Sequence, residues 1–202
     1  RGFRLGTWAL HGHLCGLERE ERIAEQLFIF LEHLYFYYLR IMATLFERMI
    51  QLADEVFEVK HDPKQLDVNE AVIQRLIQIH PASVSEYNEG EGPAAWVLIF
   101  PTTSALMHSF LKGAISEKEL FEQTPVDASY DCIYLCSALV LEEYRRQGIV
   151  KNLSTLSIQS ICKTHPIKHL FVWAFSAEGD HCAAQIAKLS SLPLLKRENP
   201  KH

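Results

Sequence analysis

The chain has 202 residues, of which 48% are hydrophobic, 22% charged and 10% aromatic. This composition is typical of a globular domain and excludes a disordered or fibrous chain. The 20 lysines and arginines stand against 25 aspartates and glutamates, for a formal net charge of −5, so no overall basic surplus favours nucleic acid or another polyanion as a partner.

The cysteines and the start of the chain bear on its compartment. The five cysteines are Cys15, Cys132, Cys136, Cys162 and Cys182. An odd number without a Cys-x-x-Cys pair is typical of reduced thiols, and no charged-then-apolar leader opens the sequence. We therefore expect a cytoplasmic protein.

The first residues, 1–17, are glycine-rich and predict no regular element. His11, His13 and Cys15 are residue types that bind zinc or copper, but no second ligand cluster follows at the spacing of a zinc finger. We therefore predict an irregular segment without a metal site.

A membrane-like window covers residues 27–46, but Glu32, His33 and Arg40 interrupt it. A charged side chain at the centre of a bilayer costs about 2.5–3.5 kcal/mol on insertion scales. The sequence therefore predicts no membrane span.

Within this region the pattern predicts a helix over 18–31, a strand rich in aromatic residues over 33–42, and an amphipathic helix over 44–58. A single helix over 18–59 is an alternative because no glycine or proline interrupts it. Such a helix would favour a helical dimerisation protein.

The next predicted elements are a helix over 67–79, a short strand over 83–87 and an apolar strand over 94–101. Asp67, with Glu70 three residues later, is the expected N-cap of this helix.

Residues 102–123 predict a helix in two pieces, with a break at Gly113. Ser116 and Glu119 have the spacing of a capping box, which marks the start of the second piece.

The second half alternates strands and helices. We predict a buried strand over 130–140, a helix over 147–163, a strand over 168–175 and a closing helix over 180–190. Alternation of this kind favours a mostly parallel sheet.

The segment most informative about function is Leu139–Leu153, in which a buried strand runs into a polar turn and then into a helix that starts at a glycine. Backbone N–H groups at a helix N-terminus have no intrahelical partner, and the helix dipole is positive there. Gly148 lets an anion approach the main chain, and Arg145, Arg146 and Lys151 add positive charge. The segment therefore predicts an anion site.

These residues resemble the signature of the GNAT superfamily of acyl-CoA-dependent N-acyltransferases. In that family a strand ends in a V-x-P-E-Y-like turn, followed by R/Q-x-x-G-x-G/A. Here Val140–Tyr144 is followed by Arg145, Arg146, Gln147, Gly148, Ile149 and Val150. Glu142 stands where proline is common, and Val150 stands where the family has glycine or alanine.

The resemblance extends over residues 35–195 and implies the fold class: α/β, with a GNAT-like mixed central sheet flanked by helices. It implies an N-terminal extension, 1–34, with one extra helix, and a GNAT-like acyl-CoA-binding domain, 35–202. Only about a dozen residues follow the last predicted helix, enough for one short strand and not for the family's closing hairpin.

The resemblance also implies a site. Main-chain groups of Leu139, Val140 and Leu141 would pair with the pantetheine arm of acetyl-CoA, and N–H groups of residues 146–151 would hold its pyrophosphate. A main-chain N–H near Leu139 would stabilise the oxyanion. Trp173 and Ser176 stand where the family's acyl arm enters.

An amine acceptor must lose a proton before it attacks, because a lysine-like amine titrates near 10.4. Tyr134, Cys136 and Ser137 on the central strand are candidate bases by position. The family's usual acid, a tyrosine on the last helix, has no counterpart here, and Cys182 and Ser190 are open substitutes.

We therefore expect an acetyl-CoA-dependent N-acetyltransferase with a primary amine acceptor, and the sequence is also compatible with a homodimer. The alternative is a non-catalytic acyl-CoA sensor or interaction module on the same fold.

Overall fold

The structure is a computed structural model that describes Gln26, residues 65–89 and residues 92–198. The chain divides into two compact units, Arg1–Thr44 and Leu45–His202, and all described residues except Gln26 belong to the second. Gln26 is helical. The other expectations for residues 1–64, including the strand over 33–42 and the helix over 44–58, lie outside the described residues.

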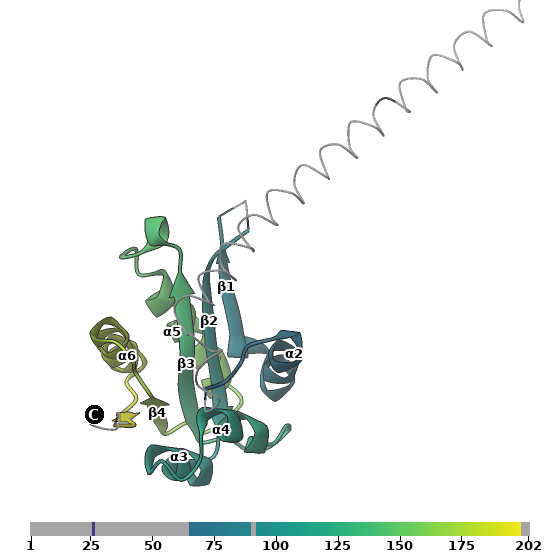
Figure 1. The fold of residues 1–202 in the computed structure, drawn as a ribbon, viewed down its shortest axis with the longest axis vertical. Coiled ribbons are helices and arrows are strands. Elements are labelled where there is room, and N and C mark those ends of the chain that lie inside the picture. Colours follow the sequence, from purple (N-terminus) through teal and green to yellow (C-terminus); the bar gives the residue numbers. More distant parts are fainter. Residues whose placement is uncertain (1–25, 27–64, 90–91, 199–202) are drawn as a thin grey trace, which may run out of the picture. The chain divides into compact units, whose positions relative to one another are not determined.

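A five-stranded mixed sheet forms the centre, in the order β1-β2-β3-β4-β5 (Figure 1). The strands are β1 (Val84–Asn88), β2 (Pro93–Thr102), β3 (Cys132–Val140), β4 (His169–Val172) and β5 (Leu194–Lys196). The β1–β2 and β2–β3 pairs are antiparallel, whereas β3–β4 and β4–β5 are parallel. The predicted mixed sheet, its parallel second half and the short final strand are confirmed.

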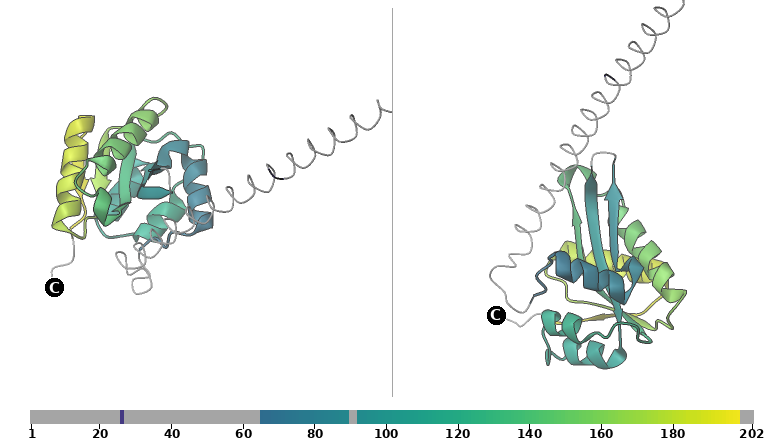
Figure 2. Two further views of the ribbon diagram at one scale, coloured as in Figure 1. Left: turned by 90° about the horizontal axis from the view of Figure 1, so that it is seen from above. Right: turned by 90° about the vertical axis from the view of Figure 1, so that its right-hand side faces the viewer.

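Helices cover both faces of the sheet (Figures 1 and 2). They are α2 (Glu70–Ile79), α3 (Ser104–Leu111), α4 (Glu117–Gln123), α5 (Ile149–Cys162) and α6 (Ala177–Ser190), with short 3₁₀ turns η1 (Pro81–Ser83) and η2 (Glu142–Tyr144). Among the described residues no helix is both long and apolar enough to cross a bilayer.

The alternation of side chains along the strands produces two cores, one on each face. On β3, Tyr134 faces the helices α2, α3 and α4, whereas Ile133 and Leu135 face α5 and α6. On β4, Phe171 and Val172 divide in the same way. Strands buried on both faces explain the near-continuous apolar runs in the sequence.

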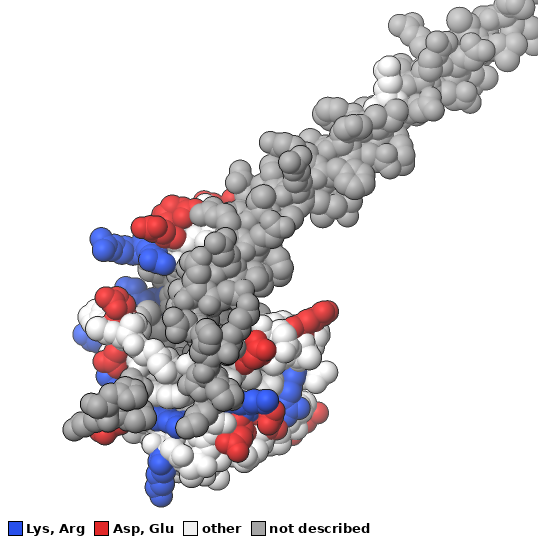
Figure 3. All heavy atoms as spheres, in the orientation of Figure 1, with Lys and Arg blue, Asp and Glu red and all other residues white. Residues whose placement is uncertain are grey.

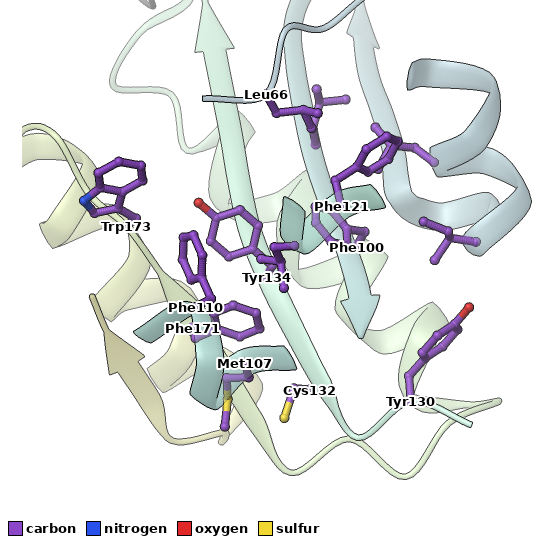
Figure 4. Close-up of a cluster of buried hydrophobic side chains, with 14 residues drawn as sticks. Leu66, Phe100, Met107, Phe110, Phe121, Tyr130, Cys132, Tyr134, Phe171 and Trp173 are labelled. Atoms are coloured by element: carbon purple, nitrogen blue, oxygen red, sulfur yellow. The ribbon is translucent and has the colours of Figure 1, made fainter. Parts of the chain in front are cut away.

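The first core is rich in aromatic side chains (Figure 4). The Phe110 and Tyr134 rings lie edge to face with centroids 5.2 Å apart, and the Tyr134 and Phe171 centroids are 5.0 Å apart. Tyr134, Phe110 and Phe171 are fully buried. Ring pairs of this geometry add about 0.5–1.5 kcal/mol each beyond the burial of apolar area.

The insertion between β2 and β3 confirms the predicted two-piece helix. Gly113 has a φ of +73° between α3 and α4. Ser116 and Glu119 form the capping box, since each side chain bonds the backbone N–H of the other residue. Glycine adopts such a positive φ at the least cost of any residue, which explains why the helix breaks there.

The start of α2 differs from the prediction. Asn69 is the N-cap, and its side chain accepts a hydrogen bond from the Val72 backbone N–H. Asp67 lies two residues before it. Asparagine caps as well as aspartate does, so the sequence pattern placed the start of the helix two residues early.

Two boundaries near the carboxyl end also differ. The strand predicted over 168–175 ends at Val172. The last helix begins at Ala177, because Ser176 is its N-cap and accepts from the Gly179 backbone N–H at 3.0 Å. The residues between these two elements are those that leave the sheet.

His80 joins α2 to the end of α5. Its Nδ1 accepts from the Ala82 backbone N–H at 3.0 Å, so the proton lies on Nε2, which is 3.3 Å from the Thr164 hydroxyl. Burial, and then the nearby His165, lower the pKa of His80 below its ordinary value of 6.5. The folded chain therefore favours the neutral ring.

Acid destabilises the protein through this histidine. The unfolded chain binds a proton at His80 more readily than the folded chain does. The contribution of the neutral His80 ring to stability is therefore fully present above about pH 6.5 and is lost as the pH falls through and below that value. We predict that moving from pH 7.5 to pH 5.5 lowers the Tm of the wild type more than that of His80→Asn. Asparagine still accepts from the Ala82 N–H and does not titrate. An equal loss in both proteins would contradict this.

Candidate functional site

A β-bulge in β3 shapes the site. Leu98 on β2 pairs with Ser137 and Ile99 pairs with Leu135, which leaves Cys136 as an extra residue. A bulge bends its strand, increases the local twist and alters where side chains point. Cys136 and Ser137 therefore lie on the α2, α3 and α4 side together, instead of on opposite faces.

At the same level β3 separates from β4. Their parallel pairing ends at the Leu135–Val172 pair, although β3 continues as a strand to Val140. Within the described chain no strand pairs with the β4-facing edge of β3 beyond Leu135. This leaves a stretch of strand edge open to an extended ligand.

A cleft of about 670 Å³ lies where the two strands part. Its walls come from β2, the bulged part of β3, the residues after β4, and the two helices α5 and α6. Apolar side chains predominate on the helix side. The lining residues are Gln65, Val97, Leu98, Ile99, Leu135, Cys136, Ser137, Ala138, Val150, Ser154, Val172, Trp173, Ala174, Phe175, Ser176, Gly179, Cys182, Ala183 and Ile186.

The start of α5 borders this cleft. Gly148 is the N-cap with φ +78° and ψ 8°, and no side chain caps the helix there. The first intrahelical bond runs from Asn152 N–H to the Gly148 carbonyl, 3.0 Å, so the N–H groups of the preceding first turn have no partner within the helix. These groups and the helix dipole make the turn suited to an anion.

The charged residues of the predicted motif lie on the surface before this turn. Arg145, Arg146 and Gln147 are exposed. Arg145 Nε donates to the Val140 carbonyl at 3.3 Å, and Gln147 donates to the Glu143 carbonyl at 3.2 Å. Arg146 has a φ of +63°. The side chains of Arg145 and Gln147 thus hold the turn by bonding to main-chain carbonyls.

The structure brings the predicted site residues only partly together. Val150 lines the cleft, Ile149 is buried and Lys151 is half-buried. Leu139 and Val140 pair with Trp96 and Ala95 of β2, and the Leu141 N–H donates to the Ala94 carbonyl. The cleft itself borders β3 slightly earlier, at residues 135–138. Trp173 and Ser176 also line it.

The three candidate bases on β3 differ in access. Tyr134 is fully buried and is not among the cleft residues, whereas Cys136 and Ser137 are. Burial raises the pKa values of Tyr134 and Cys136 well above their ordinary range, and the neighbouring Glu117 raises them further. Both groups therefore stay protonated at neutral pH.

Glu117 is a buried acidic residue beside the cleft that the sequence pattern did not indicate. It is the first residue of α4, where an acidic side chain is ordinary and exposed, yet here it is 6% exposed. Its carboxylate accepts from the Tyr134 hydroxyl at 2.8 Å and from the Leu66 backbone N–H at 2.9 Å. Burial raises its pKa, and these hydrogen bonds oppose the rise. The packing of β3 against α4 is the cause, which periodicity does not reveal.

The two proposed substitutes for the family's acid also differ. Cys182 on α6 lines the cleft, and burial raises the pKa of its thiol. Ser190 lies at the end of the same helix, outside the cleft, with a buried hydroxyl that has no hydrogen-bond partner among the described residues.

The distribution of charged side chains and of metal-binding residue types adds little information about the site. Basic and acidic side chains are intermixed over the described part of the face in Figure 3. Within residues 65–89 and 92–198, histidine, cysteine and acidic side chains form no cluster that could hold a metal ion.

The chain has a structural likeness to a solved protein but matches no known family. A scan of known protein families finds no match, and neither does a search of curated proteins. Among solved structures the chain is similar to an aminoglycoside acetyltransferase from an uncultured soil metagenomic sample, crystallised with trehalose. The TM-score is 0.44 at 18% identity, covering 79% of this chain and 86% of that one. A likeness of this extent establishes no shared activity.

Gly148 makes the turn before α5 sensitive to substitution. An added Cβ would meet Lys151 Cε at an unstrained 3.8 Å, so space is not limiting, but the φ of +78° is. We predict that Gly148→Ala lowers the free energy of unfolding by about 1–2 kcal/mol and that Gly148→Asn costs less, because asparagine tolerates this conformation. Urea denaturation measures both. Equal losses, or none in the alanine variant, would contradict the assigned backbone geometry.

Proposed function

We propose that the chain binds acetyl-CoA, or a related acyl-CoA, and transfers the acyl group to a primary amine, as a GNAT-type N-acyltransferase. The observation that carries this proposal is the cleft between the parting strands β3 and β4, bordered by the uncapped start of α5. An extended arm with a pyrophosphate at one end fits this combination of an open strand edge and an anion-binding turn.

The start of α5 would hold the pyrophosphate. Backbone N–H groups from Arg146 to Lys151 surround the Gly148 turn, which no side chain caps. Arg145 and Arg146 are exposed beside it and would add charge-assisted hydrogen bonds. Val150 stands where the family has glycine or alanine, and its larger side chain is half-buried at the cleft wall. Its backbone N–H still belongs to the first turn of α5 and would remain available to the pyrophosphate.

The free edge of β3 would hold the pantetheine arm. The amides of such an arm can bond to an unpaired strand edge as an added strand does. This is the role expected of Leu139, Val140 and Leu141, and the edge that β4 leaves unpaired begins just before them, after Leu135. A main-chain N–H of this edge would then polarise the thioester carbonyl.

The cleft connects the two faces of the sheet. Val97 and Ile99 line it from the α5 and α6 side, and Leu98 and Cys136 from the other side. Donor and acceptor could thus approach one carbonyl carbon from opposite faces. Holding two reactants in this way contributes much of the rate without a covalent intermediate, and a thiol leaves readily because its pKa is near 8.5.

One observation favours a non-catalytic acyl-CoA sensor. The α6 residues at the cleft are Gly179, Cys182, Ala183 and Ile186, so α6 presents no tyrosine there to protonate the leaving thiolate. A sensor would share the binding features above and lack turnover.

The test of binding is thermal unfolding with acetyl-CoA. We predict a Tm that rises with acetyl-CoA concentration, because a ligand of the folded state stabilises it by mass action. Replacing both Arg145 and Arg146 by alanine should raise the Kd by roughly tenfold or more, the value of one to two charge-assisted bonds. The matched control replaces Lys163 and Lys168, two exposed lysines beyond the other end of α5, and should leave the Kd unchanged.

Release of the CoA thiol with a panel of primary amines separates the two functions. Binding with release supports the transferase, whereas binding without release supports the sensor. No shift at millimolar acetyl-CoA would contradict both.

A further inference from the structure

A buried carboxylate lies directly behind the wall of the cleft. Cys136, the bulge residue, lines the cleft, and its thiol donates to Glu117 Oε1 at 3.7 Å. The other carboxylate oxygen accepts from the Leu66 N–H, and the preceding Gln65 also lines the cleft. The carboxylate is thus one side chain away from any molecule bound there.

The surroundings of this carboxylate are fixed. Tyr134 donates its hydroxyl proton to the same oxygen that Cys136 contacts, at 2.8 Å. Arg197 faces Glu117 from the segment after β5, and its charge favours the ionised carboxylate. Arg197 is itself held by ring contacts, 4.5 Å from the Phe110 centroid and 4.4 Å from the Trp173 centroid. Within the described residues, Tyr134, Cys136 and Arg197 are the titratable or charged groups that face Glu117.

The protonation preferences suit transfer from thiol to carboxylate. Burial raises the pKa of Glu117, which makes its carboxylate a stronger base than an exposed one. Burial and the adjacent carboxylate hold the Cys136 pKa well above its ordinary value, so the thiol keeps a proton to pass on. A thiolate nucleophile beside a carboxylate is correspondingly disfavoured.

We infer that Glu117 is the terminal proton acceptor for an amine bound in the cleft and that the Cys136 thiol carries the proton to it. In this step an N–H bond of the substrate ammonium breaks as an S–H bond forms at Cys136. The original S–H bond breaks as an O–H bond forms on Glu117. The net change is a neutral amine, ready to attack, and a protonated carboxyl group. The inference rests on the proposed acyl transfer for its substrate.

The proton step from Cys136 to Glu117 can be tested without knowing the acceptor. Iodoacetamide alkylates Cys136 only as the thiol loses its proton, and peptide mass spectrometry follows the rate from pH 6 to pH 9. Removing the Glu117 charge also lowers the Cys136 pKa, which by itself would speed alkylation. We expect loss of the general base, worth about 10²–10⁴-fold, to outweigh this effect, so that Glu117→Gln lowers the rate at Cys136 at pH 7 by about tenfold or more.

The sign of the change separates the relay from simple electrostatics. If Glu117 acts only as a neighbouring negative charge, its removal favours the thiolate and the alkylation rate rises. An unchanged or increased rate in Glu117→Gln would therefore overturn the inference. So would a Cys136 that stays unmodified in the native wild type while the exposed Cys162 reacts.

A matched control removes a buried tyrosine hydroxyl that does not contact Glu117. Tyr130 lies in the same aromatic core and donates to the Pro125 carbonyl, so we expect Tyr130→Phe to perturb the core and keep the wild-type rate. A loss in Tyr130→Phe as large as that in Glu117→Gln would indicate a packing effect and contradict the relay. Alkylation of Cys162 serves as the internal reference in each protein, and Tm values verify folding.

Turnover supplies the second readout. With acetyl-CoA and any amine of the panel that is acylated, kcat/KM should fall in Glu117→Gln and Cys136→Ala and should be retained in Cys136→Ser, whose hydroxyl can also pass a proton. Wild-type levels in Cys136→Ala would overturn the relay. Absence of both acetyl-CoA binding and turnover would instead contradict the proposed function, while the alkylation result still decides the proton step.

Discussion

The separation of β3 from β4 after the Leu135–Val172 pair is the constraint on which the site depends. The bulge at Cys136 supplies the bend. Without it, alternation along β3 would place Cys136 and Ser137 on opposite faces. With it, Ser137 joins Cys136 on the face that carries Glu117. Beyond Leu135, no described strand pairs with the β4-facing edge of β3, and the cleft lies there.

Aromatic and cationic side chains pack around the residues that follow β4. Trp173 leaves the sheet one residue after β4 and stacks on Phe175, with centroids 4.5 Å apart. The Trp173 ring also contacts the Phe110 ring and the guanidinium of Arg197. Arg197 also donates to the Ile115 carbonyl at 3.1 Å, which ties the end of the chain to the segment before α4. Aromatic and cation–π contacts therefore hold the residues that follow β4.

Sequence signals within a few residues, such as a glycine or a capping pair, correctly predicted features that depend only on neighbouring residues. Gly113 and the capping box at Ser116 define two helices without reference to the rest of the fold, and the glycine-led start of α5 was predicted for the same reason. The early end of β4, the bulge at Cys136 and the burial of Glu117 depend on how the layers pack. An acidic first helical residue has the same sequence pattern whether it faces solvent or β3, so no pattern could have selected Glu117.

Hydrogen–deuterium exchange with and without acetyl-CoA tests the central claim, that the parting of β3 and β4 and the start of α5 form one acyl-CoA site. We predict slower exchange on binding over two segments, residues 136–152 and residues 173–183, because the ligand would bond the free edge of β3 and the first turn of α5. Exchange elsewhere in the described sheet should not change. Unaltered exchange in both segments at saturating acetyl-CoA, or protection confined to another part of the chain, would contradict the account.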